Sequence, residues 1–199
     1  MKNLTVTLVL CFCMICPMLK AQEKISAGQL GKEIYPALLV IDLQNDYLPH
    51  MSEGDKKTAL DTINSAIALF HKNNLPVIRI YHHDVLRGPQ PGTDGFEYPK
   101  SVAIADSDPK VIKQYQDAFA KTCLDSLLKV RGVNTVFLCG LSATGCVLGT
   151  YFGALDHDYL ALMLREGLIS PDTKQTEMIR DICRTIGFGS VKNMLSRKR

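Results

Sequence analysis

The chain has 199 residues, of which 46% are hydrophobic and 22% are charged, and its formal net charge is +3 at pH 7. This length and apolar fraction suit one globular domain with a full hydrophobic core. The positive excess is small and falls partly in residues 196–199. Because no basic stripe with interleaved aromatic residues accompanies it, nucleic-acid binding is not expected.

The first 21 residues differ in character from the rest. Lys2 precedes an apolar run over residues 4–19, and Lys20 and Ala21 lead into a polar stretch. This pattern predicts a signal peptide over residues 1–21, cleaved after Ala21, and hence a periplasmic or secreted protein. The apolar run is short of the about 20 residues that a spanning helix needs. An uncleaved membrane anchor is the alternative, and no stable membrane insertion is expected after cleavage.

Beyond this segment, residues 22–35 read as a flexible lead and residues 36–199 as the folded domain. An apolar run over residues 36–42 ends in Asp42. Continuous apolar character is typical of a strand that is buried on both faces, as in a parallel sheet. The domain is therefore expected to begin with a strand that is buried on both faces.

A helix is predicted over residues 55–73 from its i, i+3, i+4 apolar spacing. A second strand is predicted over residues 76–81. Residues 84–110 are rich in Gly, Pro and Asp and predict a long loop. Loops of this length are usually functional, so we expect this one to set substrate specificity, with Arg87, Phe96 and Tyr98 as candidate residues.

The remaining elements continue the alternation of amphipathic helices and apolar strands. They are a helix over residues 117–131 closed by Gly132, a strand over 135–139, a helix over 146–155, a strand over 160–164, a helix over 173–186 with Met178, Ile179, Ile182 and Ile186 turned inward, and an edge strand over 190–195. This order predicts a three-layer α/β/α fold with a mostly parallel, Rossmann-like sheet and helices on both faces. In such folds, ligands bind beyond the carboxyl ends of the strands.

Seven cysteines occur in the chain, and four of them follow the predicted signal peptide. We interpret Cys123, Cys139 and Cys183 as small buried apolar residues, although a disulfide among them stays open. No Cys-x-x-Cys pair and no His/Cys spacing typical of structural zinc occurs beyond residue 21.

Cys146 differs from the other cysteines because it follows a strand and a turn of small residues and opens a helix. A helix N-terminus carries a positive dipole end that lowers the pKa of a thiol. Cys146 is therefore the first candidate for a nucleophile.

Three separated motifs resemble one known family. They are residues 39–47, with Asp42 after the first strand; residues 113–119, which begin with Lys113; and the turn over residues 140–147, with Cys146. Together they resemble the isochorismatase-like cysteine hydrolases, which include nicotinamidases and other amidases. The resemblance runs from residue 36 to the end of the chain.

The resemblance implies a catalytic triad. Cys146 would be the nucleophile, Asp42 would take its proton, and Lys113 would keep that acid ionised and favour the thiolate. The thiolate would attack a carbonyl carbon, expel an amine and leave a thioester that water hydrolyses. The backbone N–H groups of Ser142 and Cys146 would form the oxyanion hole, with a cis peptide bond before Ser142.

Four further residues are candidates for the substrate pocket: Gln44, His82, His83 and Tyr115. The alternatives are that Gln44 shapes the turn after Asp42 and that His82 or His83 caps its strand. Nicotinamidases bind a metal through an acid and histidines after the second strand, and this chain lacks their spaced histidines. We therefore expect no metal, no other cofactor and no nicotinamidase specificity. Asp117 is expected to cap the helix that follows it.

The expected activity is cleavage of a C–N bond in a small molecule whose identity the sequence does not reveal. One alternative is vinyl-ether hydrolysis by the acid alone, as in isochorismatases proper. Another is a non-catalytic binding protein on the same fold, and a third is a thiol redox protein that pairs Cys139 with Cys146. Because members of this family commonly assemble, a homo-oligomer is expected, with its number of subunits open.

Overall fold

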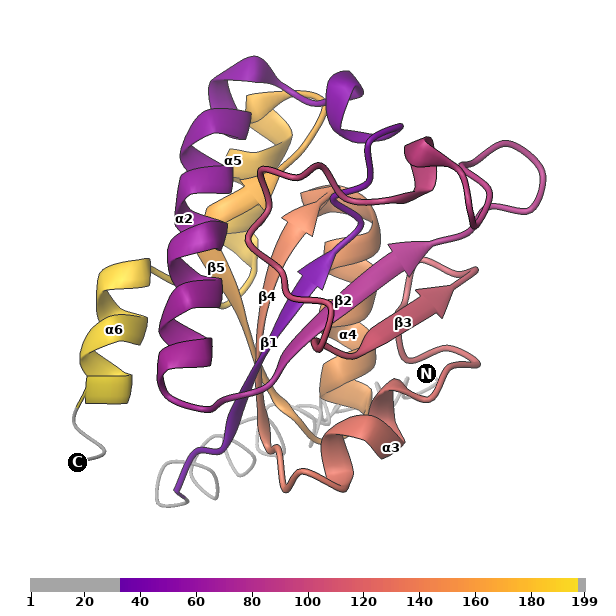
Figure 1. Ribbon diagram of the computed structural model, residues 1–199. Coiled ribbons are helices and arrows are strands. Elements are labelled where there is room, and N and C mark those ends of the chain that lie inside the picture. The colour runs from indigo at the N-terminus through magenta and orange to yellow at the C-terminus, as the bar shows by residue number, and fades with distance from the viewer. Residues whose placement is uncertain (1–32, 197–199) are drawn as a thin grey trace, which may run out of the picture. The chain divides into compact units, whose positions relative to one another are not determined.

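The computed structural model describes residues 33–196, and their centre is a six-stranded parallel sheet (Figure 1). The strands are β1 (Pro36–Ile41), β2 (Val77–His82), β3 (Lys110–Lys113), β4 (Thr135–Leu141), β5 (Leu160–Ile169) and β6 (Thr185–Ile186). They lie in the order β3-β2-β1-β4-β5-β6, and every neighbouring pair is parallel. The predicted α/β fold with a parallel sheet is confirmed.

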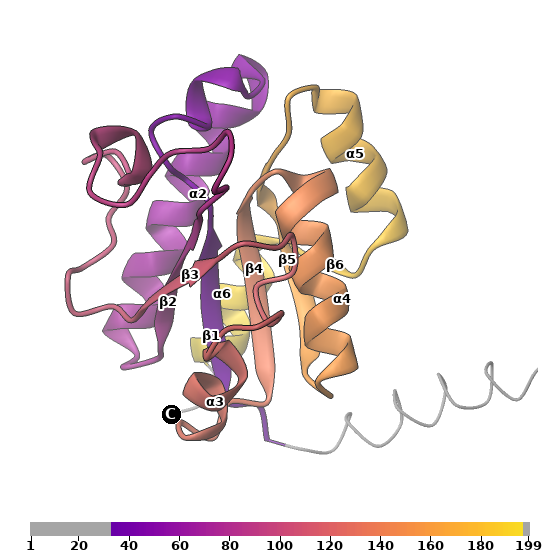
Figure 2. The same ribbon diagram turned by 90° about the vertical axis from the view of Figure 1, so that its right-hand side faces the viewer.

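Helices cover both faces of the sheet, as the edge-on view shows (Figure 2). One core contains residues of α2 (Glu53–Lys72) and α6 (Phe188–Ser196), and the other contains residues of α3 (Leu124–Lys129), α4 (Leu148–Asp156) and α5 (Thr173–Ile182). Strand β1 supplies alternate residues to the two cores and is buried along its whole length. This two-sided burial explains its continuous apolar sequence.

The predicted signal peptide lies outside the described residues, as does most of the lead, so export stays a prediction. Within residues 33–196, none of the helices combines the length and the apolar character that crossing a bilayer requires.

The helix predicted over residues 117–131 is much shorter than expected, because α3 begins only at Leu124. Asp117 does not cap it. Its Oδ1 accepts a hydrogen bond from the Phe119 N–H at 2.8 Å, which makes a local turn. The same carboxylate lies against α4, where a Cβ on Gly153 would stand 2.1 Å from Asp117 Oδ1. Asp117 therefore forms a local turn and packs against α4, and the prediction that it caps a helix was wrong.

The C-terminal elements also differ from prediction. The helix expected over residues 173–186 ends at Ile182, and β6 follows it as the edge strand. Residues 190–195 form part of helix α6 because Val191 and Leu195, four positions apart, both enter the core. On α5, Ile179 is buried, but Met178 and Ile182 are 51% and 68% exposed, so the predicted inward face is narrower than expected.

The long loop after β2 is anchored by aromatic residues. Phe96 and Tyr98 are buried, and both rings stack on Tyr81, with centroid distances of 5.2 and 4.4 Å. The Tyr98 hydroxyl lies 2.9 Å from the Val40 carbonyl oxygen and 2.6 Å from that of Ile80. These two residues are therefore core residues that fix the loop to the sheet, and the interpretation of them as specificity residues was wrong.

The four cysteines in the described part of the chain are all free thiols. Cys139 is buried, as predicted, with its Sγ 3.5 Å from the Leu39 carbonyl oxygen. Cys183 is partly buried against the core that contains α5. Cys123 is exposed, so its interpretation as a buried apolar residue was wrong.

Gly140 of β4 lies against the main chain of Ile41 in β1 and gives a test of this packing. Its φ is +113°, and a Cβ there would lie 2.1 Å from the Ile41 carbonyl oxygen. We expect Gly140→Ala to lower the free energy of unfolding by about 3 kcal/mol or more, because it combines backbone strain with a main-chain clash. Urea unfolding measures the change.

Gly132 is the matched control, since its φ is +67° and a Cβ there meets nothing within 4 Å. Gly132→Ala should cost only the left-handed backbone conformation, about 1–2 kcal/mol. An equal decrease in the free energy of unfolding for the two variants would show that the clash with the Ile41 carbonyl adds nothing to the effect of Gly140→Ala.

Candidate active site

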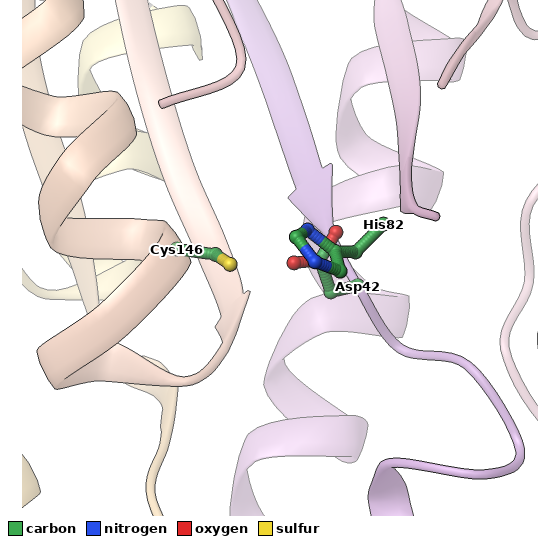
Figure 3. A group of neighbouring side chains, drawn as sticks. All are labelled: Asp42, His82 and Cys146. Carbon is green, nitrogen blue, oxygen red and sulfur yellow. The ribbon is translucent and has the colours of Figure 1, made fainter. Parts of the chain in front are cut away.

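The side chains of the three predicted catalytic residues come together at the carboxyl ends of the strands. Asp42 directly follows β1, Lys113 ends β3, and Cys146 lies in the turn between β4 and α4. The sulfur of Cys146 points toward Asp42 and His82 (Figure 3). Parallel strands bring their carboxyl ends to one rim, which is why residues so far apart in sequence meet here.

A buried ion pair joins Asp42 and Lys113. The Lys113 Nζ lies 2.8 Å from Asp42 Oδ2, and the two side chains are 0% and 2% exposed, respectively. The other carboxylate oxygen, Asp42 Oδ1, is buried and has no hydrogen-bond partner in the described structure. Asp42 also has a φ of +54°, which is uncommon for a residue with a side chain. The free oxygen leaves this carboxylate able to accept a proton.

His82 is the second partner of the Lys113 ammonium. The His82 Nδ1 lies 2.9 Å from Lys113 Nζ. An ammonium group can only donate, so Nδ1 is the acceptor and the ring proton is assigned to Nε2. Burial, followed by the Lys113 charge, lowers the pKa of His82, in agreement with a neutral ring. His82 therefore belongs to the same polar cluster as Asp42 and Lys113.

Gln44 holds the main chain of His82. Its Oε1 accepts from the His82 N–H at 2.7 Å, and its Nε2 donates to the His82 carbonyl oxygen at 3.0 Å. The Gln44 side chain is fully buried. The structure thus places Gln44 behind His82, where it supports the site without lining a substrate pocket.

Cys146, like His82, is partly exposed, and the pKa of its thiol is raised to about 12. Burial is the largest cause, the Asp42 carboxylate adds to it, and the Lys113 charge opposes it. The sequence-based expectation of a lowered pKa was therefore wrong. The thiol rests in its protonated form, and attack requires a neighbouring base.

The turn that presents Cys146 is a single wide helical turn over Ala143–Val147. The Ser142 carbonyl oxygen accepts from the N–H groups of Gly145 at 3.0 Å and Val147 at 3.2 Å. Gly145, with φ −114° and ψ −105°, breaks the helical path before Cys146. The peptide bond between Leu141 and Ser142 is cis, as the family pattern implies. The predicted oxyanion donors thus belong to one compact turn.

The other two predicted pocket residues lie elsewhere. His83 Nε2 lies 2.9 Å from Gln90 Oε1, and the Tyr115 hydroxyl accepts from Lys121 Nζ at 2.8 Å. Both residues line a hollow of about 150 Å³ with Ile112 of the edge strand β3. His82 and His83 are successive residues at a strand end and therefore point to opposite faces. The structure does not bring His83 and Tyr115 into the catalytic cluster.

Tyr47 is a site residue that sequence reasoning missed. Its ring meets the His82 ring edge-on, with centroids 6.1 Å apart. Burial, then the nearby Asp42 charge, raises the pKa of the Tyr47 hydroxyl well above its usual value, so the hydroxyl stays neutral. The only signal in the sequence was its place at the end of the first motif.

Asp42, His82 and Cys146 offer oxygen, nitrogen and sulfur atoms that all lie within 4.8 Å of one another. Zinc takes ligands of these kinds. However, the Lys113 ammonium already contacts two of the three donor residues, at 2.8 and 2.9 Å. A fixed positive charge in that position opposes a divalent cation, so these residues do not fit a resident metal.

Residues 36–183 match the isochorismatase domain family model. The uncharacterized isochorismatase family protein YddQ of Bacillus subtilis is 27% identical over 135 residues, which cover 65% of this chain and 75% of that protein. The maleamate amidohydrolase of Pseudomonas putida is 38% identical over 66 residues, 32% of this chain and 31% of the enzyme. The structure of N-carbamoylsarcosine amidase from Thermoplasma acidophilum matches with a TM-score of 0.69 and 23% identity, over 78% of this chain and 97% of that one.

The family match covers most of the described residues and includes all three motifs, with Asp42, Lys113 and Cys146. An amidohydrolase is among the relatives by sequence, and an amidase is among the structural neighbours. The chain therefore belongs to the isochorismatase family and is a hydrolase.

Proposed function

We propose that this hydrolase cleaves a C–N, amide-type bond of a small molecule through Cys146, Asp42 and Lys113. The observation that carries the proposal is the unpartnered Asp42 Oδ1 within a buried ion pair, beside a thiol that is protonated at rest. A buried acceptor without a partner is costly unless it has a task. Acceptance of the Cys146 proton is such a task.

The reaction begins when Asp42 takes the thiol proton and the Cys146 sulfur attacks the substrate carbonyl carbon. The backbone N–H groups of Ser142 and Cys146 stabilise the oxyanion. Asp42 then passes its proton to the leaving amine, and a thioester remains on Cys146. Asp42 next activates a water that attacks the thioester, which releases the acid and restores the thiol.

Lys113 has an electrostatic task in this scheme. Its ammonium, 2.8 Å from Asp42 Oδ2, keeps the carboxylate charged and ready to act as a base. It also favours the thiolate that forms during attack, since its charge opposes the rise in the pKa of Cys146. Because the sulfur becomes anionic only as Asp42 is neutralised, the cluster never holds two uncompensated negative charges.

Amide cleavage is favoured over the alternatives by the relatives and by the nucleophile. Maleamate amidohydrolase and N-carbamoylsarcosine amidase are named for amide-type substrates. Vinyl-ether hydrolysis needs the acid alone and gives no task to a cysteine whose sulfur points toward Asp42. A binding protein would not need a buried base beside a thiol.

We expect Cys146→Ala, Asp42→Asn and Lys113→Met each to lower kcat/KM by about a thousandfold or more, because each removes one member of a unit that acts together. The measurement is a screen of small amides and ureides with purified protein. Matched controls are Cys123→Ala, Asp46→Asn and Lys110→Met, which change exposed residues of the same types. Full activity of Cys146→Ala would overturn the thioester route and favour acid-catalysed ether hydrolysis.

The resting thiol gives a second prediction. With a pKa of about 12, the thiolate fraction of Cys146 should rise about tenfold per pH unit between pH 7 and 10. We therefore expect its alkylation by iodoacetamide to follow that slope without a plateau, as measured by mass spectrometry of the modified peptide. Exposed Cys123 serves as the internal reference. A plateau below pH 8 would show that the thiol is ionised at rest.

Asp42→Asn should move alkylation and turnover in opposite directions. The Asp42 charge raises the pKa of Cys146, so its removal should lower that pKa and speed alkylation at pH 8 by about threefold or more. Turnover should fall because the base is lost. A parallel fall in both rates, with circular dichroism showing a folded protein, would contradict the role of Asp42 as the base.

A further inference from the structure

We infer that His82 is a positioning residue that holds the Lys113 ammonium between Asp42 and Cys146. This inference rests on the proposed function, since it assigns a task within the same catalytic cluster. The interpretation of His82 as a substrate-pocket residue stays a prediction.

A lysine ammonium carries three N–H donors and no acceptor. Lys113 is buried, so each donor needs a protein partner. Asp42 Oδ2 takes one at 2.8 Å, and His82 Nδ1 takes another at 2.9 Å. These two partners come from different segments and together fix the position of Nζ, whose charge opposes the rise in the pKa of Cys146.

The His82 residue that accepts from Lys113 is itself held in place by its neighbours. Both main-chain polar groups of His82 are bound by Gln44, at 2.7 and 3.0 Å, and its ring packs edge-on against Tyr47. Gln44 follows Asp42 by two residues. One short segment after β1 therefore supplies both the proposed base, Asp42, and the side chain that holds the main chain of His82 in place. Such support is expected where a side chain must be placed within a fraction of an ångström.

The charge of His82 suits this task. A neutral ring can accept from Lys113, whereas an imidazolium would place a second positive charge against the ammonium. Lys113, Asp42, Asp84 and His83 are the titratable groups that act on His82. Burial, then the Lys113 charge, lowers the pKa of the ring and keeps it neutral. The geometry and the charge thus agree on an acceptor role.

Three substitutions of His82 separate the acceptor from the bulk of the ring. His82→Asn can place Oδ1 where Nδ1 stands, His82→Gln can place its amide only near the Nε2 position, and His82→Leu has no acceptor. We expect iodoacetamide to alkylate Cys146 about tenfold more slowly at pH 9 in the Leu and Gln variants, because an ammonium that lacks one acceptor is less well placed to favour the thiolate. The Asn variant should stay within about threefold of the wild type.

Alkylation needs no substrate, so it tests His82 even if the proposed amidase activity fails. Where an amide substrate is found, kcat should fall with the alkylation rate while KM stays within about threefold, because the inferred role touches no substrate. Urea unfolding checks that each variant folds, and if His82→Leu does not, the comparison of Asn with Gln decides. Unchanged alkylation in Leu and Gln, equal loss in Asn and Gln, or a rise in KM alone would each overturn the inference.

Discussion

The buried ion pair between Asp42 and Lys113 is the interaction on which the site depends. Burial of two charges is costly unless the geometry is good and the remaining donors are satisfied. Here the sheet order places β2 between β1 and β3, so the residue that ends β2, His82, lies beside the pair and accepts from Lys113. The order of the strands therefore decides which side chain completes the hydrogen bonding of the ammonium.

The same burial explains how the catalytic work is divided. A thiol at a helix N-terminus is expected to ionise easily, yet burial and the Asp42 carboxylate raise the pKa of Cys146 to about 12. Lys113 opposes this rise but does not cancel it. A protonated thiol beside an ionised carboxylate is the lower-energy arrangement, since only one negative charge then lies near the ammonium. In the proposed mechanism, proton transfer to Asp42 is thus part of the attack itself.

Apolar patterns predicted the secondary structure correctly in long segments but not in short ones. The apolar run of β1 and the periodic face of α2 were assigned correctly because burial repeats over many residues. Strand β3 has only four residues and α6 only nine, so each shows few repeats of its pattern. Asp117 was misassigned because a residue that favours helix caps also forms local turns, and its contact with α4 decided between them.

The sequence by itself determined the alternation of strands and helices and the choice of Asp42, Lys113 and Cys146 as candidate catalytic residues, because local apolar patterns and contiguous motifs carry that information. Only the tertiary structure decided that Gln44 braces His82, that His82 accepts from Lys113, and that the thiol rests protonated. These outcomes depend on hydrogen bonds between residues 31 to 71 positions apart and on burial by several elements at once. The sequence around a single residue predicts neither the hydrogen bonds nor the burial, because these groups meet only in the complete sheet.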